Sequence, residues 1–140
     1  MNNQNNIGLN KNNLNYGNLL SRVESFINKE FSGFKEIEAI ILFGSAAKGT
    51  YKSGSDIDLC VILDKNAKRI SEIKIHEYFL DLSKDLDINI EVLYIYINNL
   101  KNWDPILIQN LIKEGILLFG KTDYEIPFKN YIEKNLYVSG

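Results

Sequence analysis

The sequence predicts one domain of the α/β (α+β) class, in which helices flank a small mixed β-sheet. Two observations carry this prediction. Short apolar runs rich in β-branched residues alternate with longer segments whose apolar residues recur at helical spacing, as in a sheet covered by helices. The chain has 140 residues, of which 45% are hydrophobic and 24% charged, so it can bury one core but not two.

Four long helices and one short helix are expected. The apolar residues of the first long helix fall on one face, and those of the second recur at broadly helical spacing. The third long helix is capped by Asp104, begins at Pro105 and ends before Gly115. The first long helix ends before Gly33. The first part of GSAAKGTYKSGS predicts the short helix, and its remainder predicts a loop. The long helices are expected over residues 19–31, 67–86, 105–114 and 123–138.

Four strands are expected between these helices. The runs EAIILF and DIDLCVIL are short, apolar and rich in β-branched residues, which is typical of buried strands. The run DINIEVLYIYI alternates polar and apolar residues in its first half, which predicts a third strand with two different faces. A fourth, short strand follows Gly115. The strands are expected over residues 38–43, 56–63, 87–97 and 116–119.

The two ends of the chain differ in composition from the middle. Residues 1–13 are dominated by asparagine and have too few apolar side chains to order themselves, so we expect a disordered arm. Residues 14–120 form the expected domain. Residues 121–140 predict a C-terminal helical tail, which packs either on this chain or on a partner.

Composition excludes several functional classes. Cys60 is the single cysteine, so the chain can form neither an internal disulfide nor a cysteine-rich metal site. The net charge of −2 argues against general nucleic-acid binding, which needs a basic surface. We find no signal peptide and no apolar run long enough to cross a membrane, so we expect a cytoplasmic protein without membrane contact.

Gly44 and Ser45 follow the first strand and begin the short helix. Glycine has no β-carbon, so a phosphate can approach the backbone, and the first N–H groups of a helix attract an anion. Ser45 can add a hydroxyl donor, and Lys48 and Lys52 can bring positive charge to a triphosphate.

Asp56 and Asp58 lie at alternate positions of the second strand, so their carboxylates share one face. Two such charges repel each other unless a cation lies between them, and Mg²⁺ binds through one or two carboxylates together with substrate phosphates. The third strand offers a further carboxylate. Glu91 is favoured because an unpaired charge in mid-strand would be costly, whereas Asp87 lies at the strand's edge, where it can be solvated.

The motif Gly44-Ser45, ten residues, then Asp56-x-Asp58 resembles the signature of the DNA polymerase β-like nucleotidyltransferase superfamily. The chain is most similar to the minimal nucleotidyltransferases that act as antitoxins in HEPN/MNT toxin–antitoxin pairs. The segments INIEVLYI and PILIQNLIKEGILLF extend the resemblance over most of the chain. It differs from the family pattern at Glu91, where the family usually has Asp, and at Ala47-Lys48, near which relatives often have Arg.

This resemblance implies a nucleotidyltransferase fold, two Mg²⁺ ions and an NTP, with ATP favoured. Asp56, Asp58 and Glu91 would be the catalytic, metal-binding carboxylates, and Gly44, Ser45, Lys48 and Lys52 would contact the nucleotide. The implied activity is transfer of AMP to a hydroxyl group. The favoured acceptor is a tyrosine of a helical HEPN toxin, and this toxin would form a hetero-oligomer with the chain. Two alternatives remain open: an aminoglycoside-like enzyme acting on a small molecule, and a non-catalytic antitoxin that binds and masks its partner.

Overall fold

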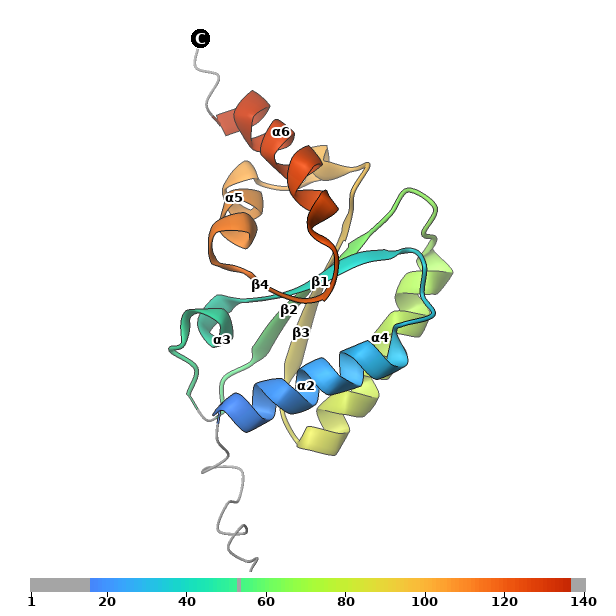
Figure 1. Ribbon diagram of the computed structural model, residues 1–140, viewed down its shortest axis with the longest axis vertical. Coiled ribbons are helices and arrows are strands. Elements are labelled where there is room, and N and C mark those ends of the chain that lie inside the picture. The colour runs from blue at the N-terminus through green and yellow to red at the C-terminus, as the bar shows by residue number, and fades with distance from the viewer. Residues whose placement is uncertain (1–15, 53, 137–140) are drawn as a thin grey trace, which may run out of the picture.

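The computed structural model describes residues 16–52 and 54–136. The expected arm over 1–13 therefore lies outside the described residues. Helices and strands alternate in the order the sequence predicts (Figure 1). The α-helices are α2 (Tyr16–Glu30), α3 (Gly44–Lys48), α4 (Arg69–Leu86), α5 (Pro105–Glu114) and α6 (Glu125–Leu136), and the 3₁₀ turns are η2 (Leu100–Asn102) and η3 (Thr122–Tyr124). The strands are β1 (Ile37–Phe43), β2 (Ile57–Leu63), β3 (Ile90–Tyr96) and β4 (Ile116–Gly120).

The four strands form one mixed sheet in the order β3-β2-β1-β4. β1 runs antiparallel to both β2 and β4, whereas β2 and β3 run parallel. The end of β1 and the starts of the other three strands therefore meet at the same edge of the sheet. This edge carries the polar motifs that the sequence analysis selected.

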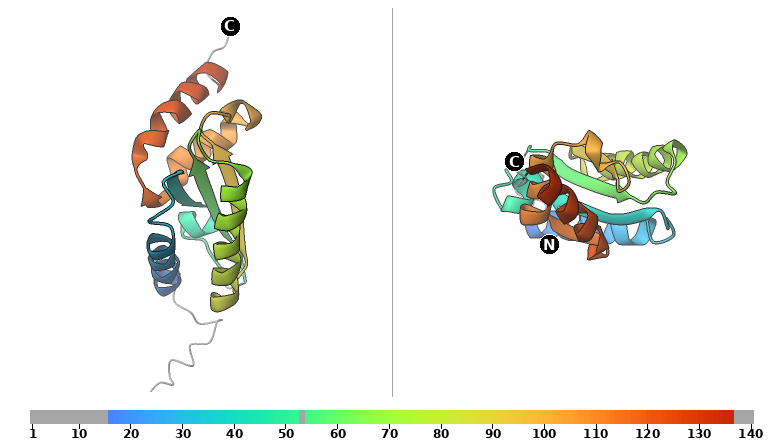
Figure 2. Two further views of the ribbon diagram at one scale, coloured as in Figure 1. Left: turned by 90° about the vertical axis from the view of Figure 1, so that its right-hand side faces the viewer. Right: turned by 90° about the horizontal axis from the view of Figure 1, so that it is seen from above.

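Helices cover both faces of the sheet, and each face has its own apolar core. The expectation of a single core is therefore wrong, because the sheet separates the buried residues of this one domain into two groups. Ile40 and Leu42 of β1 pack with α2 and α4, whereas Ala39 and Ile41 pack with α5 and α6. The same alternation holds in β2, because successive side chains of a strand point to opposite faces. The two pairs of helices lie on opposite sides of the sheet in Figure 1, and the left view of Figure 2 shows α6 (red) above α2 (blue).

Over the described residues the predicted elements are confirmed, with differences of one to three residues at most ends. The last two residues of the helix expected over 123–138 lie outside the described residues. α5 begins as expected: Asp104 caps it by accepting a hydrogen bond from the Ile106 N–H at 2.9 Å, and Pro105 is its first residue. Two elements differ by three residues at their start: α2 begins at Tyr16 and not at residue 19, and β3 begins at Ile90 and not at residue 87. Asp87 instead caps the end of α4 in a left-handed conformation with φ 53°, and this turn occupies the residues expected to begin the strand.

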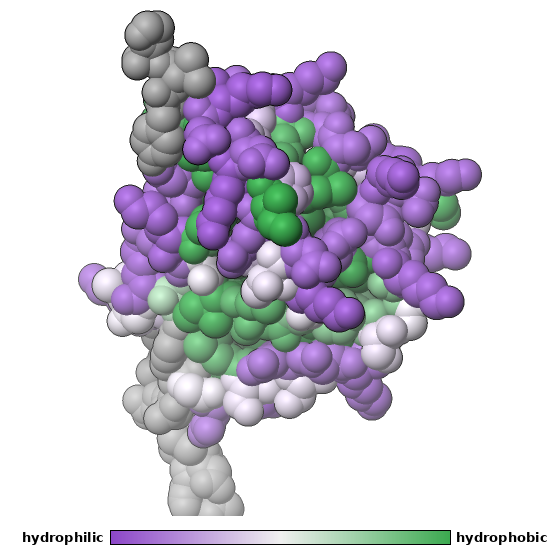
Figure 3. Space-filling model, turned by 45° about the horizontal axis from the view of Figure 1, so that its top comes forward, coloured by the Kyte–Doolittle hydropathy of each residue, from purple (hydrophilic) through white to green (hydrophobic). Residues whose placement is uncertain are grey.

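The C-terminal helix packs on this chain. Phe128 and Ile132 of α6 are buried in the core on the α5 side of the sheet. Figure 3 shows the molecule with the top of the Figure 1 view tilted towards the reader. This surface is largely hydrophilic, with apolar areas enclosed by polar residues. Among the described helices, none combines the length and the apolar character needed to cross a bilayer.

Phe31 is the centre of the core on the α2–α4 side. Its ring contacts those of Phe26, Phe34, Tyr78 and Phe79, with centroids 5.1 to 6.4 Å apart. We expect Phe31→Ala to lower the free energy of unfolding by about 3–5 kcal/mol, because it leaves a cavity that these rings cannot fill. Urea denaturation measures this. Ile126→Ala is the control, because Ile126 is 67% exposed, and it should change stability by less than about 0.5 kcal/mol. Equal losses in the two variants would contradict this assignment of the core.

Candidate active site at one edge of the sheet

The fold places Asp58 and Glu91 on one face at one edge of the sheet, and Asp56 lies close enough to Asp58 to raise its pKa. Asp58 is the second residue of β2 and pairs in register with Glu91, the second residue of β3. Their strand neighbours at alternate positions, Cys60 and Leu93, pack on the α5–α6 side, so both acidic side chains belong to that side. Ile57 and Leu59 are fully buried on the opposite side, as predicted. Asp56 directly precedes β2.

Gly44 is in close contact with Asp58. Phe43, the last residue of β1, pairs with Asp58, and Gly44 follows with φ 70°, a backbone conformation that favours glycine. A β-carbon on Gly44 would overlap Oδ2 of Asp58. The space that glycine leaves therefore accommodates the Asp58 carboxylate. This contact was not predicted from the sequence. Contact of a phosphate with the Gly44 backbone stays a prediction.

Asp58 lies in an electrostatic environment that disfavours its charge. Partial burial raises its pKa, and the negative charges of Asp56 and Glu91 raise it further. The chain therefore holds acidic groups together against their mutual repulsion. Such an arrangement is typical of a site that binds a cation.

Two polar neighbours of Asp56 were not selected from the sequence. Asn89 donates a hydrogen bond from Nδ2 to Oδ1 of Asp56 at 2.8 Å, and its backbone carbonyl accepts the Ile57 N–H. The pKa of Tyr51 is raised by burial and by the charge of Asp56. Asn89 stands two residues before Glu91, as Asp56 stands two before Asp58, and this spacing is the signal that could have identified it. No comparable sequence signal points to Tyr51.

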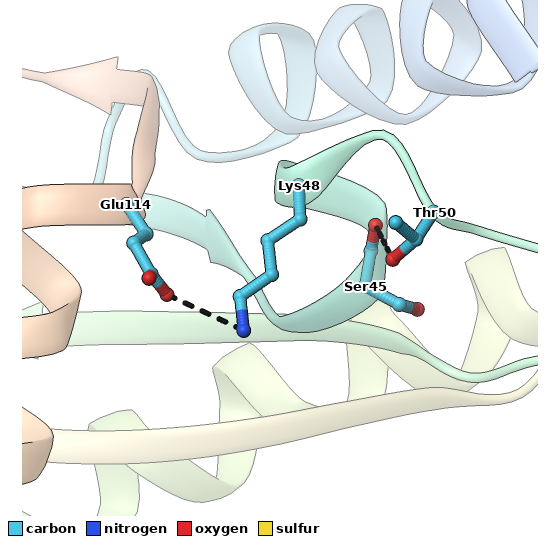
Figure 4. Close-up of polar contacts among 4 residues, drawn as sticks. All are labelled: Ser45, Lys48, Thr50 and Glu114. Atoms are coloured by element: carbon cyan, nitrogen blue, oxygen red, sulfur yellow. Dashed lines mark hydrogen bonds and ion pairs between the residues drawn. The ribbon is translucent and has the colours of Figure 1, made fainter.

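The predicted nucleotide contacts lie along α3 and the loop after it. The carbonyl of Ser45 accepts hydrogen bonds from the backbone N–H of Thr50 at 3.0 Å and from its hydroxyl at 3.4 Å, which folds the loop back onto the helix. Lys48 forms an ion pair with Glu114 of α5, with 3.5 Å between Nζ and Oε1 (Figure 4). Lys52 lies exposed in the loop before the motif aspartates.

The expectation that Glu91 lies in the middle of its strand, where an unpaired charge is costly, was wrong. Glu91 is exposed and not enclosed in mid-strand, because β3 is an edge strand and begins only one residue earlier. The preference for Glu91 over Asp87 is instead supported by register, since Glu91 pairs with Asp58. Asp87 is exposed at the end of α4, outside the strand.

The donor atoms available at this edge suit a hard divalent cation. Asp56, Asp58 and Glu91 offer carboxylate oxygens, the ligand type that Mg²⁺ prefers, and Gly44 leaves room for the Asp58 carboxylate. Among residues 16–52 and 54–136, no three or more His, Cys, Asp or Glu side chains are grouped closely enough to form a metal site by themselves. Mg²⁺ commonly completes its coordination with water and substrate phosphates, so an incomplete protein ligand set fits this ion.

A mixed four-stranded sheet, with a glycine-serine turn after the first strand and an Asp-x-Asp pair at the start of the second, defines a nucleotidyltransferase-type domain. Residues 26–124 match the family described as "Polymerase beta, Nucleotidyltransferase". The chain belongs to this family, which confirms the resemblance found in the sequence. No curated protein sequence matches the chain.

Three solved structures of toxin–antitoxin proteins share the fold. One, determined with AMP-PNP, is 25% identical, with a TM-score of 0.61 over 82% of this chain and 88% of that chain. A mutant of the toxin–antitoxin MntA-HpeT is 21% identical, with a TM-score of 0.60 over 89% of this chain and 90% of that chain. The toxin–antitoxin MntA-HepT is 19% identical, with a TM-score of 0.55 over 87% and 88%.

Replacing Gly44 tests its contact with Asp58. Gly44→Ala and Gly49→Ala both put alanine into a left-handed conformation, with φ 70° and 77°, which costs about 1–2 kcal/mol. Only Gly44→Ala adds a clash with Asp58, since a β-carbon on Gly49 meets nothing within 4 Å. We therefore expect Gly44→Ala to lose clearly more stability in urea denaturation. Equal losses would show that the carboxylate moves aside freely.

The raised pKa of Asp58 predicts a pH-dependent gain from Asp58→Asn. At pH 7 the wild type keeps a charge that the fold disfavours, so the variant should be more stable. In the unfolded chain the pKa of Asp58 lies near the ordinary value of 3.8, and in the folded chain it is higher. As the pH falls, the folded wild type therefore takes up a proton at Asp58 before the unfolded chain does. The advantage of the variant should therefore shrink as pH falls towards 3.8. Denaturation curves over this range measure it, and an advantage that grows on acidification would refute the assignment.

Proposed function

We propose that this protein transfers AMP from ATP to a hydroxyl group, and that the acceptor is a tyrosine of a helical HEPN-type toxin with which the chain assembles. The observation that carries the proposal is the gathering of Asp56, Asp58 and Glu91 beside Gly44 at one edge of a nucleotidyltransferase sheet. An acidic cluster of this kind has little structural use, because it is held together against repulsion. Its value lies in binding cations that accompany a triphosphate.

In the proposed reaction, the acceptor oxygen attacks the α-phosphorus of ATP. The new oxygen–phosphorus bond forms as the bond to the β-phosphate bridge breaks, pyrophosphate leaves, and the hydroxyl proton passes to solvent. Asp56 and Asp58 would hold two Mg²⁺ ions, and Glu91 would complete the ligands on the acceptor side. When bound, Mg²⁺ neutralises phosphate charge and lowers the pKa of the acceptor hydroxyl.

The remaining residues would position the reactants. Asn89 holds the Asp56 carboxylate, so this ligand is oriented before substrate arrives. Gly44, Ser45, Lys48 and Lys52 would bind the triphosphate from α3 and the following loop. Because phosphoryl transfer depends mostly on placement and electrostatics, a domain of this size can carry it.

Two features support a protein acceptor. The acidic cluster is reachable, since Asp56 and Asp58 are only partly buried and Glu91 is exposed. The structural neighbours named above are toxin–antitoxin proteins, and one of them was solved with AMP-PNP. These observations favour a partner chain, which would cover the open site, over a small acceptor held in a pocket of this chain.

Substitution of the acidic residues tests the catalytic assignment. We expect Asp58→Asn to lower the transfer rate at least about 100-fold, because it removes a ligand charge without changing the size of the side chain. Glu91→Gln should also lower the rate. Asp87→Asn is the matched control and should retain activity, because asparagine also accepts the left-handed conformation at that helix end. Transfer from α-labelled ATP measures all three, and an active Asp58→Asn enzyme would refute the site.

The acceptor is identified by following the label. The chain is co-expressed with candidate helical partners and incubated with α-labelled ATP and Mg²⁺. Label on a partner tyrosine, located by mass spectrometry, supports the proposal. Label on a small molecule such as an aminoglycoside would favour the small-molecule enzyme. A stable complex without label would favour an antitoxin that only masks its partner.

A further inference from the structure

The ion pair between Lys48 and Glu114 joins two elements that are far apart in the sequence. Lys48 is the last residue of α3, and Glu114 is the last residue of α5. Their charged atoms lie 3.5 Å apart, with the side chains 54% and 46% exposed. In Figure 4 the two side chains reach towards each other from their helices, beside the turn made by Ser45 and Thr50.

The fold fixes Glu114 at the edge of the sheet where the acidic cluster lies. Gly115 follows Glu114, and a β-carbon on Gly115 would overlap the Leu111 carbonyl and the side chain of Ile41. The junction between α5 and β4 is therefore packed tightly against β1. Ile116 then pairs with Leu42, only two residues before Gly44. Glu114 thus starts from a well-defined backbone position next to α3.

This contact gives Lys48 a carboxylate partner where the proposed function requires a phosphate partner. Both are anions, and one ammonium group cannot bind both at full strength. The pair is about half exposed, and ion pairs of this kind are weak, so a triphosphate with its higher charge can displace Glu114. After displacement, Glu114 stays solvated because its side chain already reaches solvent.

We propose that Glu114 competes with the triphosphate for Lys48 and thereby lowers the affinity of the site for ATP. This inference rests on the proposed function, since it takes Lys48 as a phosphate ligand. It assigns to Glu114 a regulatory role: in the nucleotide-free chain, Glu114 binds the Lys48 ammonium group that would otherwise be available to the triphosphate. Nucleotide binding then includes an exchange of one anionic partner for another.

The test measures the dissociation constant of Mg²⁺-ATP by titration calorimetry. Glu114→Gln removes the competing charge and keeps the size of the side chain, so we expect ATP to bind about two- to fivefold more tightly. Glu125→Gln is the matched control. It breaks the exposed Lys129–Glu125 pair of α6, which lies after the opposite end of β4, and should leave ATP binding as in the wild type.

A double-mutant cycle separates competition from simple repulsion. Lys48→Met should weaken ATP binding, and Glu114→Gln should give no gain in the Lys48→Met background. If Glu114→Gln tightens binding equally in both backgrounds, its charge acts directly on the triphosphate and competition for Lys48 is refuted. An unchanged dissociation constant in the single variant also refutes it. A wild-type chain that binds ATP and transfers AMP keeps the proposed function in either case, whereas one that binds no ATP overturns both.

Discussion

The site depends on the contact between the Asp58 carboxylate and the backbone at Gly44. β1 ends at Phe43, which pairs with Asp58, so the carboxylate must share the space at the start of α3. Only a residue without a side chain and with a positive φ fits there. This constraint links the glycine of one strand end to the aspartate of the next strand. It explains why a Gly-Ser turn and an Asp-x-Asp pair form one unit, although ten residues separate them in the sequence.

The rest of the fold supports this edge of the sheet. Two separate apolar cores clamp the sheet from both faces, so β1 and β2 are buried along their length and cannot shift register easily. A one-residue slip of β2 would turn Asp58 into the α2–α4 core and Leu59 out of it. The same packing therefore stabilises the domain and keeps the Asp58 carboxylate on the α5–α6 side, where it is only partly buried.

Electrostatics gives the site its character. The fold accepts a raised pKa at Asp58 and keeps Asp56 and Glu91 near it, which stability alone would not favour. Local polar contacts then orient individual groups: Asn89 holds Asp56, and Glu114 holds Lys48. Each of these contacts fixes the position of a charged group, and in the proposed function Glu114 would be the partner that the nucleotide displaces from Lys48.

The sequence by itself determined the order of the helices and strands, the α+β class, and the burial of Ile57 and Leu59 on the side opposite Asp58, because periodicity and local caps are properties of neighbouring residues. It also identified the family through the Gly44-Ser45 and Asp56-x-Asp58 spacing. Only the tertiary structure decided the rest. β3 begins later than expected because α4 ends in a left-handed turn at Asp87. Glu91 is exposed because β3 is an outermost strand of the sheet, paired on one side only. The contacts of Asp58 with Gly44 and of Lys48 with Glu114 likewise depend on strand pairing and helix packing between distant segments, for which no local pattern in the sequence carries a signal.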